Sequence, residues 1–67
     1  MTKQEAISQM RAGKKLTHVH FSSEEWVKSD ETGAVYTFED GVVCSEREFW
    51  HWRTALSWEG GWDLFKS

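Results

Sequence analysis

Proline is absent from this sequence of 67 residues, and cysteine occurs once, as Cys44. A single cysteine cannot form an intramolecular disulfide, and a lone thiol is typical of a reducing compartment, which we expect to be the cytoplasm. No apolar run approaches the roughly 18 residues of a membrane-spanning helix, and the first residues contain no secretory signal. Because no linker-like or low-complexity segment interrupts the chain, we expect one domain over residues 1–67 and no membrane partner.

Aromatic side chains, by contrast, are abundant: the chain has five tryptophans, four phenylalanines and one tyrosine. Four of the tryptophans lie between residues 45 and 65. A domain of this size buries only about 60% of the surface that its unfolded chain exposes. Each buried aromatic removes roughly 150–250 Å² from water. We therefore expect aromatic rings to dominate the core, and a homodimer would be another way to enlarge it.

A first helix is predicted over residues 3–12. Thr2 and Glu5 have the spacing of a capping box, in which each side chain accepts a hydrogen bond from the backbone of the other residue. Apolar residues follow at three- and four-residue spacing. Gly13 is a favourable residue directly after the last helical turn.

Alternating residues then predict an antiparallel meander. Its strands are expected at 15–21, 25–29, 34–39 and 42–44. In the first strand, Val19 and Phe21 are expected to face the core, and His18 and His20 to face solvent. In the third strand, Tyr36 and Phe38 share a face, and the following Asp40-Gly41 pair predicts a type I′ hairpin turn.

A second capping box, at 45–48, predicts a helix over residues 46–56. Phe49, Trp52 and Leu56 follow at helical spacing and are expected to face the sheet. A glycine pair then interrupts the chain, and Trp62 is expected to enter the core from a last strand. The order α-β-β-β-β-α-β predicts an α+β fold, in which a small antiparallel sheet, the meander plus the carboxy-terminal strand, packs against two helices.

The net charge of −3 is unevenly distributed along the chain. Residues 1–21 hold four basic residues and one acidic residue, and residues 22–67 hold four basic and ten acidic residues, so the two parts carry +3 and −6. An acidic body disfavours general binding to phosphate backbones. It suits either simple solubility or a face that attracts a basic partner.

Two tryptophans, Trp50 and Trp58, fall outside the apolar stripe of the second predicted helix. Exposed tryptophan is enriched in the hot spots of protein interfaces. We therefore predict that Trp58 and Trp50 anchor a protein partner, with Glu59 and Asp63 as charged residues that steer association. The alternative is that both rings form a lid that closes a small core.

The basic cluster Arg11, Lys14 and Lys15 supports a second hypothesis, a small nucleic-acid-binding module. Such a module would combine these charges with exposed rings, for which Trp26 and Tyr36 are the candidates. A third hypothesis is a self-assembling structural homodimer with the tryptophans at its seam.

The sequence offers little support for catalytic or metal-binding residues. His18, His20, Cys44 and His51 are of the types that bind zinc, but their spacing matches no standard zinc pattern. The acidic pairs fall in predicted turns, where water solvates them, so no carboxylate with a shifted pKa is expected. We therefore expect no metal, no cofactor and no enzymatic activity.

Three segments, EAISQMRAGKKLTHVHF, YTFEDG and EFWHWR...WEGGWDLF, resemble small orphan proteins encoded by tailed bacteriophages and prophages. In those proteins a short helix leads into G-K-K and a strand, a strand with E-D-G follows, and an F-W-x-x-R segment and a G-W ending close the chain. The likeness covers nearly the whole sequence. It implies a phage or prophage accessory protein in the bacterial cytoplasm that binds a host or defence protein, as an inhibitor for example, and it transfers no site residue.

Overall fold

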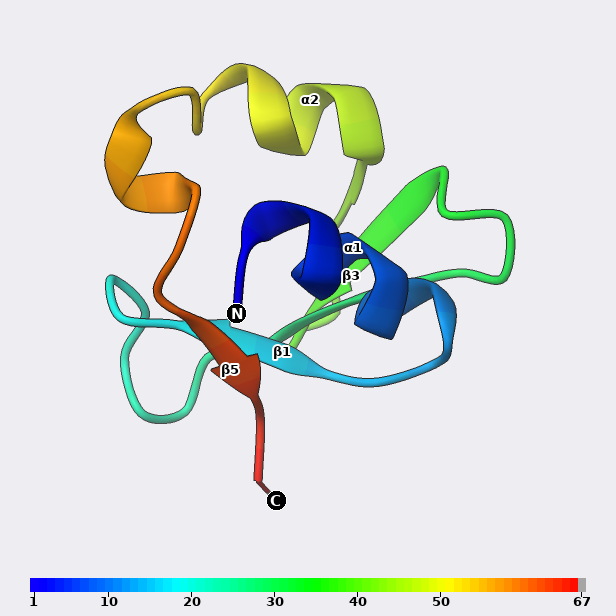
Figure 1. Cartoon of the computed structure of the whole chain (residues 1–67). Coiled ribbons are helices and arrows are strands. Elements are labelled where there is room, and N and C mark those ends of the chain that lie inside the picture. The colour runs from blue at the N-terminus through cyan, green and yellow to red at the C-terminus, as the bar shows by residue number, and fades with distance from the viewer. Residues whose placement is uncertain (67) are drawn as a thin grey trace.

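Two α-helices and a five-stranded antiparallel sheet make up the fold in the computed structural model, which describes residues 1–66 (Figure 1). In chain order the elements are α1 (Lys3–Arg11), β1 (Leu16–His18), β2 (Val27–Ser29), β3 (Val35–Phe38), β4 (Val43–Ser45), α2 (Glu46–His51), the 3₁₀ helix η1 (Leu56–Trp58) and β5 (Trp62–Leu64). The predicted α+β class and the order of helices and strands are confirmed.

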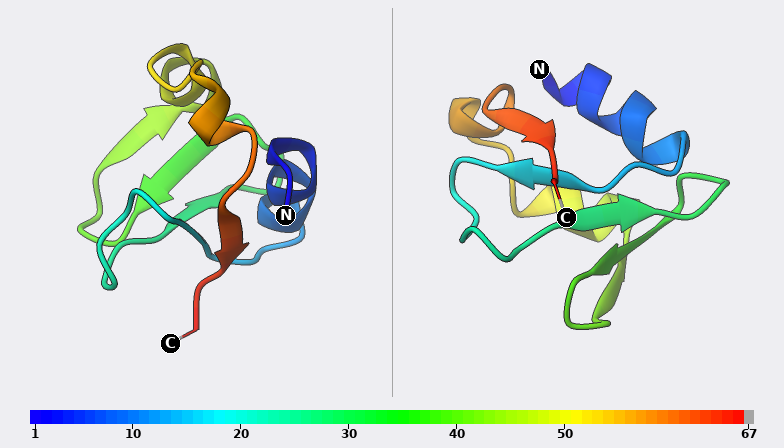
Figure 2. Two further views of the ribbon diagram at one scale, coloured as in Figure 1. Left: turned by 60° about the vertical axis from the view of Figure 1, so that its left-hand side comes forward. Right: turned by 90° about the horizontal axis from the view of Figure 1, so that it is seen from below.

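The strands lie in the order β4-β3-β2-β1-β5, so β2 is central and β1, which comes first in the chain, lies between β2 and the last strand β5. The last strand pairs with β1 over three residues, including His18 with Trp62. The register of β1 with β2 pairs only Leu16 with Val27 within residues 1–66. The sheet is twisted, and the β3–β4 hairpin runs at a marked angle to β1 (Figure 2).

Both helices pack on the same face of the sheet, because their apolar side chains meet those of four strands in one core. Each of the core side chains is at most 2% exposed: Ala6, Met10, Leu16, Val27, Tyr36, Phe49 and Trp62. Three of the seven are aromatic, which agrees with the need of a short chain for large core residues. The expected burial of Trp62 is confirmed.

Both predicted helix starts are confirmed by their hydrogen bonds. Thr2 Oγ1 accepts from the Glu5 N–H at 3.2 Å, and Glu5 Oε1 accepts from the Thr2 N–H at 2.9 Å. At α2, Ser45 Oγ accepts from the Glu48 N–H at 3.1 Å. These side chains satisfy backbone donors that the first helical turn leaves without partners.

The predicted core face of the first strand is wrong for Val19, which is 72% exposed, although Phe21 is partly buried against the core as expected. Leu16 and His18 point into the core instead. The stretch contains apolar residues in both alternating sets, and a shift by one residue exchanges the two faces. The strand also stops at His18, where a turn closes with the Phe21 N–H donating to the His18 carbonyl at 2.9 Å.

The second helix is shorter than predicted and ends at His51. Trp52 and Leu56, which were expected to face the sheet, are 78% and 87% exposed. The physical reason is Arg53, whose backbone N–H donates to the Trp50 carbonyl and not to that of Phe49. The Arg53 side chain takes the free Phe49 carbonyl instead, at 3.1 Å from Nη1.

The hairpin between β3 and β4 lies where it was predicted, but its turn type is different. No residue other than glycine has a positive φ within residues 1–66, so Asp40 cannot occupy a type I′ position. The Gly41 N–H donates to the Phe38 carbonyl, and the Phe38 N–H donates to the Val42 carbonyl. With Gly41 at φ 86°, this is a three-residue loop made of a type I turn and a left-handed glycine.

Candidate functional site

The segment from the end of α2 to the first residue of η1 presents the two most exposed large apolar side chains of residues 1–66, Trp52 and Leu56. We call residues 52–56 the Trp52 loop. It runs along the margin of the molecule, where the chain turns from α2 toward η1 (Figure 1). Neither side chain belongs to the core cluster or packs against it, so neither stabilises the core by burial.

Arg53 fixes the Trp52 loop to the body of the protein. Its guanidinium carbon lies 4.1 Å from the centre of the Phe49 ring and 5.3 Å from that of the Trp58 ring. Burial lowers the pKa of Arg53, which still remains protonated at neutral pH. Arg53 therefore holds the loop in place through a hydrogen bond to the Phe49 carbonyl and through cation–π contacts with the Phe49 and Trp58 rings.

Trp58 lies beside this loop and is partly buried against the core. Its ring centre is 4.2 Å from that of His18 and 6.0 Å from that of Trp62. The Trp62 indole N–H donates to the Trp58 carbonyl at 2.8 Å. Trp58 therefore forms part of a lid over the core and keeps a partly exposed surface next to the Trp52 loop.

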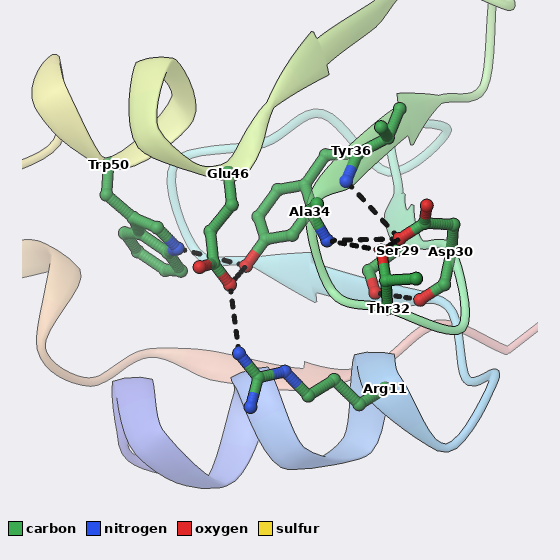
Figure 3. A network of polar contacts seen from close by, with 9 residues as sticks. Arg11, Ser29, Asp30, Thr32, Ala34, Tyr36, Glu46 and Trp50 are labelled. Atoms are coloured by element: carbon green, nitrogen blue, oxygen red, sulfur yellow. Dashed lines mark hydrogen bonds and ion pairs between the residues drawn. The ribbon is translucent and has the colours of Figure 1, made fainter.

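Trp50 is also partly buried, and its polar atom is used inside the protein. The indole N–H donates to the Tyr36 hydroxyl at 3.0 Å (Figure 3). The Lys3 ammonium lies 4.6 Å from the centre of the Trp50 ring and covers it. Of the two predicted anchors, Trp58 therefore lies next to the exposed pair, whereas Trp50 packs between α1 and β3.

The Tyr36 hydroxyl in turn joins both helices. It donates to Glu46 Oε2 at 3.1 Å, and Arg11 Nη2 lies 3.6 Å from the same oxygen (Figure 3). Burial raises the pKa of Tyr36 to about 12. Arg11 also covers the backbone of Gly33, where a β-carbon would collide with the guanidinium. The structure thus places Arg11 of the predicted basic cluster in an ion pair between α1 and α2.

A second polar group in Figure 3 orders the loop before β3. Asp30 Oδ1 accepts from the Thr32 hydroxyl at 2.9 Å and from the Ala34 N–H at 3.0 Å. The bond from Thr32 and those from the backbone lower the pKa of the Asp30 carboxyl. The Asp30 carboxylate thus provides a hydrogen-bond acceptor for the backbone of an exposed turn, which gives Asp30 a structural role.

His18 is buried, and all of its polar atoms have partners. Nε2 lies 2.7 Å from the Gly60 carbonyl and 3.0 Å from the Ser57 carbonyl, and Nδ1 accepts from the His20 N–H at 3.0 Å. These partners require a neutral ring with its proton on Nε2. Burial lowers the pKa of His18. Both nitrogens are engaged, so His18 fastens β1 to the segment after η1 and has no free lone pair for a metal.

The other titratable candidates are dispersed. Within residues 1–66 no three histidine, cysteine, aspartate or glutamate side chains come close enough together to hold a metal ion. Cys44 is half-buried, and burial raises the pKa of its thiol, which disfavours the thiolate.

The remaining predicted site residues fall on two sides of the sheet. Glu59 is exposed and follows Trp58 directly. Asp63 alternates with the buried Trp62, so its side chain lies on the opposite face from the helices. Lys14 is exposed in the turn before β1, and Lys15 precedes the buried Leu16 and therefore lies on the same face as Asp63. The structure groups Glu59 with Trp58 and separates Asp63 from them.

The sequence interpretation missed Trp52 and Leu56 as surface residues, because their spacing continues the apolar stripe of Phe49. The signals against a longer helix are the β-branched Thr54 and the glycine pair that follows Trp58.

No helix within residues 1–66 is long and apolar enough to cross a membrane. In comparisons with known proteins, no family model matches the chain, and no curated protein or solved structure is significantly similar to it.

Proposed function

We propose that this chain is a non-enzymatic module that binds another protein through the Trp52 loop, with Trp58 and Glu59 beside it. The single observation that supports this most is the exposure of Trp52, at 78%, and of Leu56 four residues later, at 87%. Tryptophan is the residue type most enriched in binding hot spots, because its large ring contributes much contact area in a buried interface.

The attachment of the loop supports the same proposal. Arg53 directly follows Trp52 in the sequence and is held by Phe49 and Trp58. A loop that is already ordered loses less conformational entropy on binding than a mobile one. The exposed pair therefore has the form of a pre-organised anchor for an apolar pocket on a partner.

The charge distribution supports a partner with a basic rim. Residues 22–67 carry a net −6, and Glu59 and Glu48 are exposed on either side of the Trp52 loop in the sequence. Complementary charge raises association rates and disfavours acidic partners. In this proposal Glu59 keeps its predicted steering role, and Trp52 and Leu56 join Trp58 as anchors.

The identity of the partner is a further part of the proposal and depends on the sequence resemblance alone. The resemblance to small phage and prophage proteins favours a host or defence protein in the bacterial cytoplasm. Covering part of such a protein is the simplest way for a small non-catalytic domain to inhibit it.

Affinity capture from bacterial lysate, with nuclease present, tests the proposal with four proteins: wild type, Trp52→Ala, Leu56→Ala and Val43→Ala. Val43 is a matched control, because it is an exposed apolar residue on β4 and outside the Trp52 loop. We expect one stoichiometric protein with wild type and Val43→Ala, and its loss with the two loop variants. The captured protein, once purified, must bind the chain directly with the same dependence on Trp52.

Self-association through the same loop is the alternative outcome of this design. Sedimentation velocity over a range of concentrations detects it as a dimer that Trp52→Ala converts to a monomer. Capture that is equal for wild type and both loop variants would contradict any role of the Trp52 loop.

A further inference from the structure

The sheet has a second face, which points away from both helices. In β1 and β5 the core-facing residues are Leu16, His18 and Trp62. Their neighbours in the chain therefore point to the other side. We call this side, near β1, β2 and β5, the outer face; its side chains are Lys15, Thr17, Trp26, Lys28, Asp63 and Phe65. Figure 2 shows α1 on one side of β1 and β5 and the carboxy-terminal segment on the other.

Two aromatic rings on the outer face form a pair of their own. Trp26 and Phe65 are half-buried, and neither is among the residues that pack against the core. Their ring centres are 6.4 Å apart. Trp26 directly precedes β2, and the Phe65 N–H donates to the Lys15 carbonyl at 2.9 Å, so the backbone holds both rings beside β1. Because neither ring packs against the core, core packing does not account for this aromatic pair.

Two lysine side chains lie over the Trp26 ring of the pair. The Lys15 ammonium lies 4.4 Å from the centre of the Trp26 ring, and that of Lys28 lies 5.8 Å from it. Among the described residues the only ion pair joins Arg11 to Glu46, so neither ammonium group has a carboxylate partner. Lys14 and Lys66 adjoin the same area in sequence, as do Glu24 and Glu25 before Trp26, and Asp63 is the acidic residue among the six outer-face side chains. These six therefore include two basic groups and one acidic group, on a chain whose net charge is −3.

We infer that the outer face binds single-stranded nucleic acid, with bases stacked on Trp26 and Phe65 and phosphates paired with Lys15 and Lys28. Rings on an open antiparallel sheet can stack on unpaired bases of any sequence. The ammonium groups of Lys15 and Lys28 lie over the Trp26 ring in the free protein, and on binding they would move from the ring to the anionic backbone that connects such bases. Paired bases in a duplex hide their flat surfaces, so the rings favour a single strand. This site shares no residue with the Trp52 loop and is independent of the protein-binding function.

Fluorescence anisotropy with labelled oligonucleotides tests this site. The probes are single-stranded oligothymidine and oligouridine of about 12 nucleotides, within the usual site sizes, and a duplex of equal length. We expect single strands to bind more tightly than the duplex. With two or three phosphates neutralised, the logarithm of the binding constant should fall with that of salt concentration with a slope of about −1.4 to −2, because single strands contribute about −0.7 per phosphate.

Charge reversals separate the outer face from general electrostatics. Lys28→Glu and Lys15→Glu should each weaken binding at low salt by about tenfold and reduce the magnitude of the salt slope by about 0.7. Arg47→Glu is the matched control, since it makes the same change in net charge at an exposed position on α2. It should leave the affinity within about twofold of wild type, because a distant exposed charge is screened by salt.

Trp26→Ala should abolish binding, and circular dichroism establishes whether the variant is folded. If it is not, the shift of the Trp26 indole NMR resonance on addition of oligothymidine to the wild-type protein replaces it. No binding at low salt, equal loss in Arg47→Glu and Lys28→Glu, preference for the duplex, or an unmoved Trp26 resonance would each overturn the inference.

Discussion

The Arg53 guanidinium donates to the Phe49 carbonyl oxygen at 3.1 Å, the acceptor that the Arg53 backbone N–H would use if α2 continued. Where the helix ends, the Phe49 carbonyl loses its backbone donor, and the Arg53 side chain takes the place of that donor. The chain then leaves the helical path at Trp52, which becomes exposed. The position of the proposed binding loop follows from this contact.

Replacing Arg53 with methionine should destabilise the protein by about 1–2 kcal/mol, because it removes a hydrogen bond and the stacking on two rings. Urea denaturation measures the change. Arg47→Met is the control, since Arg47 is exposed on the same helix and should change stability by less than about 0.5 kcal/mol. Equal effects of the two substitutions would show that Arg53 does not fasten the loop.

Tyr36 is the only tyrosine of the chain, so its ionisation can be followed by ultraviolet absorbance without interference from another tyrosine. Burial raises its pKa from the ordinary value of 10.0 to about 12. The folded protein should therefore keep Tyr36 neutral at a pH where unfolded tyrosine is half ionised. Its contribution to stability is complete below pH 10 and is lost as the pH rises toward 12. A midpoint near 10 in the folded protein would contradict the buried hydroxyl.

Tyr36→Phe should cost about 1–2 kcal/mol, because it leaves the Trp50 indole N–H without its partner. A double-mutant cycle with Trp50→Phe isolates the contact. We expect Trp50→Phe to cost less in the Tyr36→Phe background than in the wild type. Strictly additive costs would mean that the two side chains do not interact.

His18 should make stability depend on pH. Its pKa is lowered from 6.5 in the folded state, mainly by burial, so the unfolded state binds a proton first as the pH falls. The contribution of His18 to the free energy of unfolding is therefore complete above pH 6.5. It is lost as the pH falls from 6.5 toward the pKa of the folded state.

Denaturation at a series of pH values compares the wild type with His18→Gln and His51→Gln, a control at an exposed histidine. The fall in stability below pH 6.5 should be smaller in His18→Gln than in the other two proteins. The same fall in all three proteins would assign it to other groups.

Gly33→Ala should be more harmful than Gly13→Ala, although both glycines have a positive φ. An added β-carbon meets nothing within 4 Å at Gly13, whereas at Gly33 it collides with Arg11. Gly13→Ala should cost about 1 kcal/mol from backbone strain alone, and Gly33→Ala should cost more. Thermal denaturation of both variants measures the difference. The additional cost at Gly33 should shrink in an Arg11→Ala background, and an unchanged cost would rule out the clash.

Local signals in the sequence predicted the parts of the fold that local physics controls. The capping residues Thr2 and Ser45 act through hydrogen bonds within one turn, so their pattern was sufficient to place both helix starts. The hairpin was found from Asp40-Gly41, although Gly41 takes the third position of its loop. The alternation around Tyr36 placed Tyr36 and Phe38 on one face of β3 correctly, but Tyr36 is buried, so its prediction as an exposed ring of a nucleic-acid-binding module was wrong.

Features that depend on distant partners could not be predicted in this way. The face of β1 is decided by the carbonyls of Ser57 and Gly60, which satisfy His18 from the other end of the chain. The end of α2 is decided by the packing of Arg53 on Trp58. For that reason Trp52 was expected in the core, and the exposed pair that now carries the proposed function was not foreseen.

The most direct test of the protein-binding proposal is the affinity of the captured partner for wild type, Trp52→Ala and Val43→Ala, measured by isothermal titration calorimetry. The proposal predicts that Trp52→Ala weakens binding by about 2 kcal/mol or more, roughly thirtyfold, as truncation of a hot spot does. Val43→Ala should bind like the wild type. Equal affinities for wild type and Trp52→Ala, with both variants folded, would contradict it.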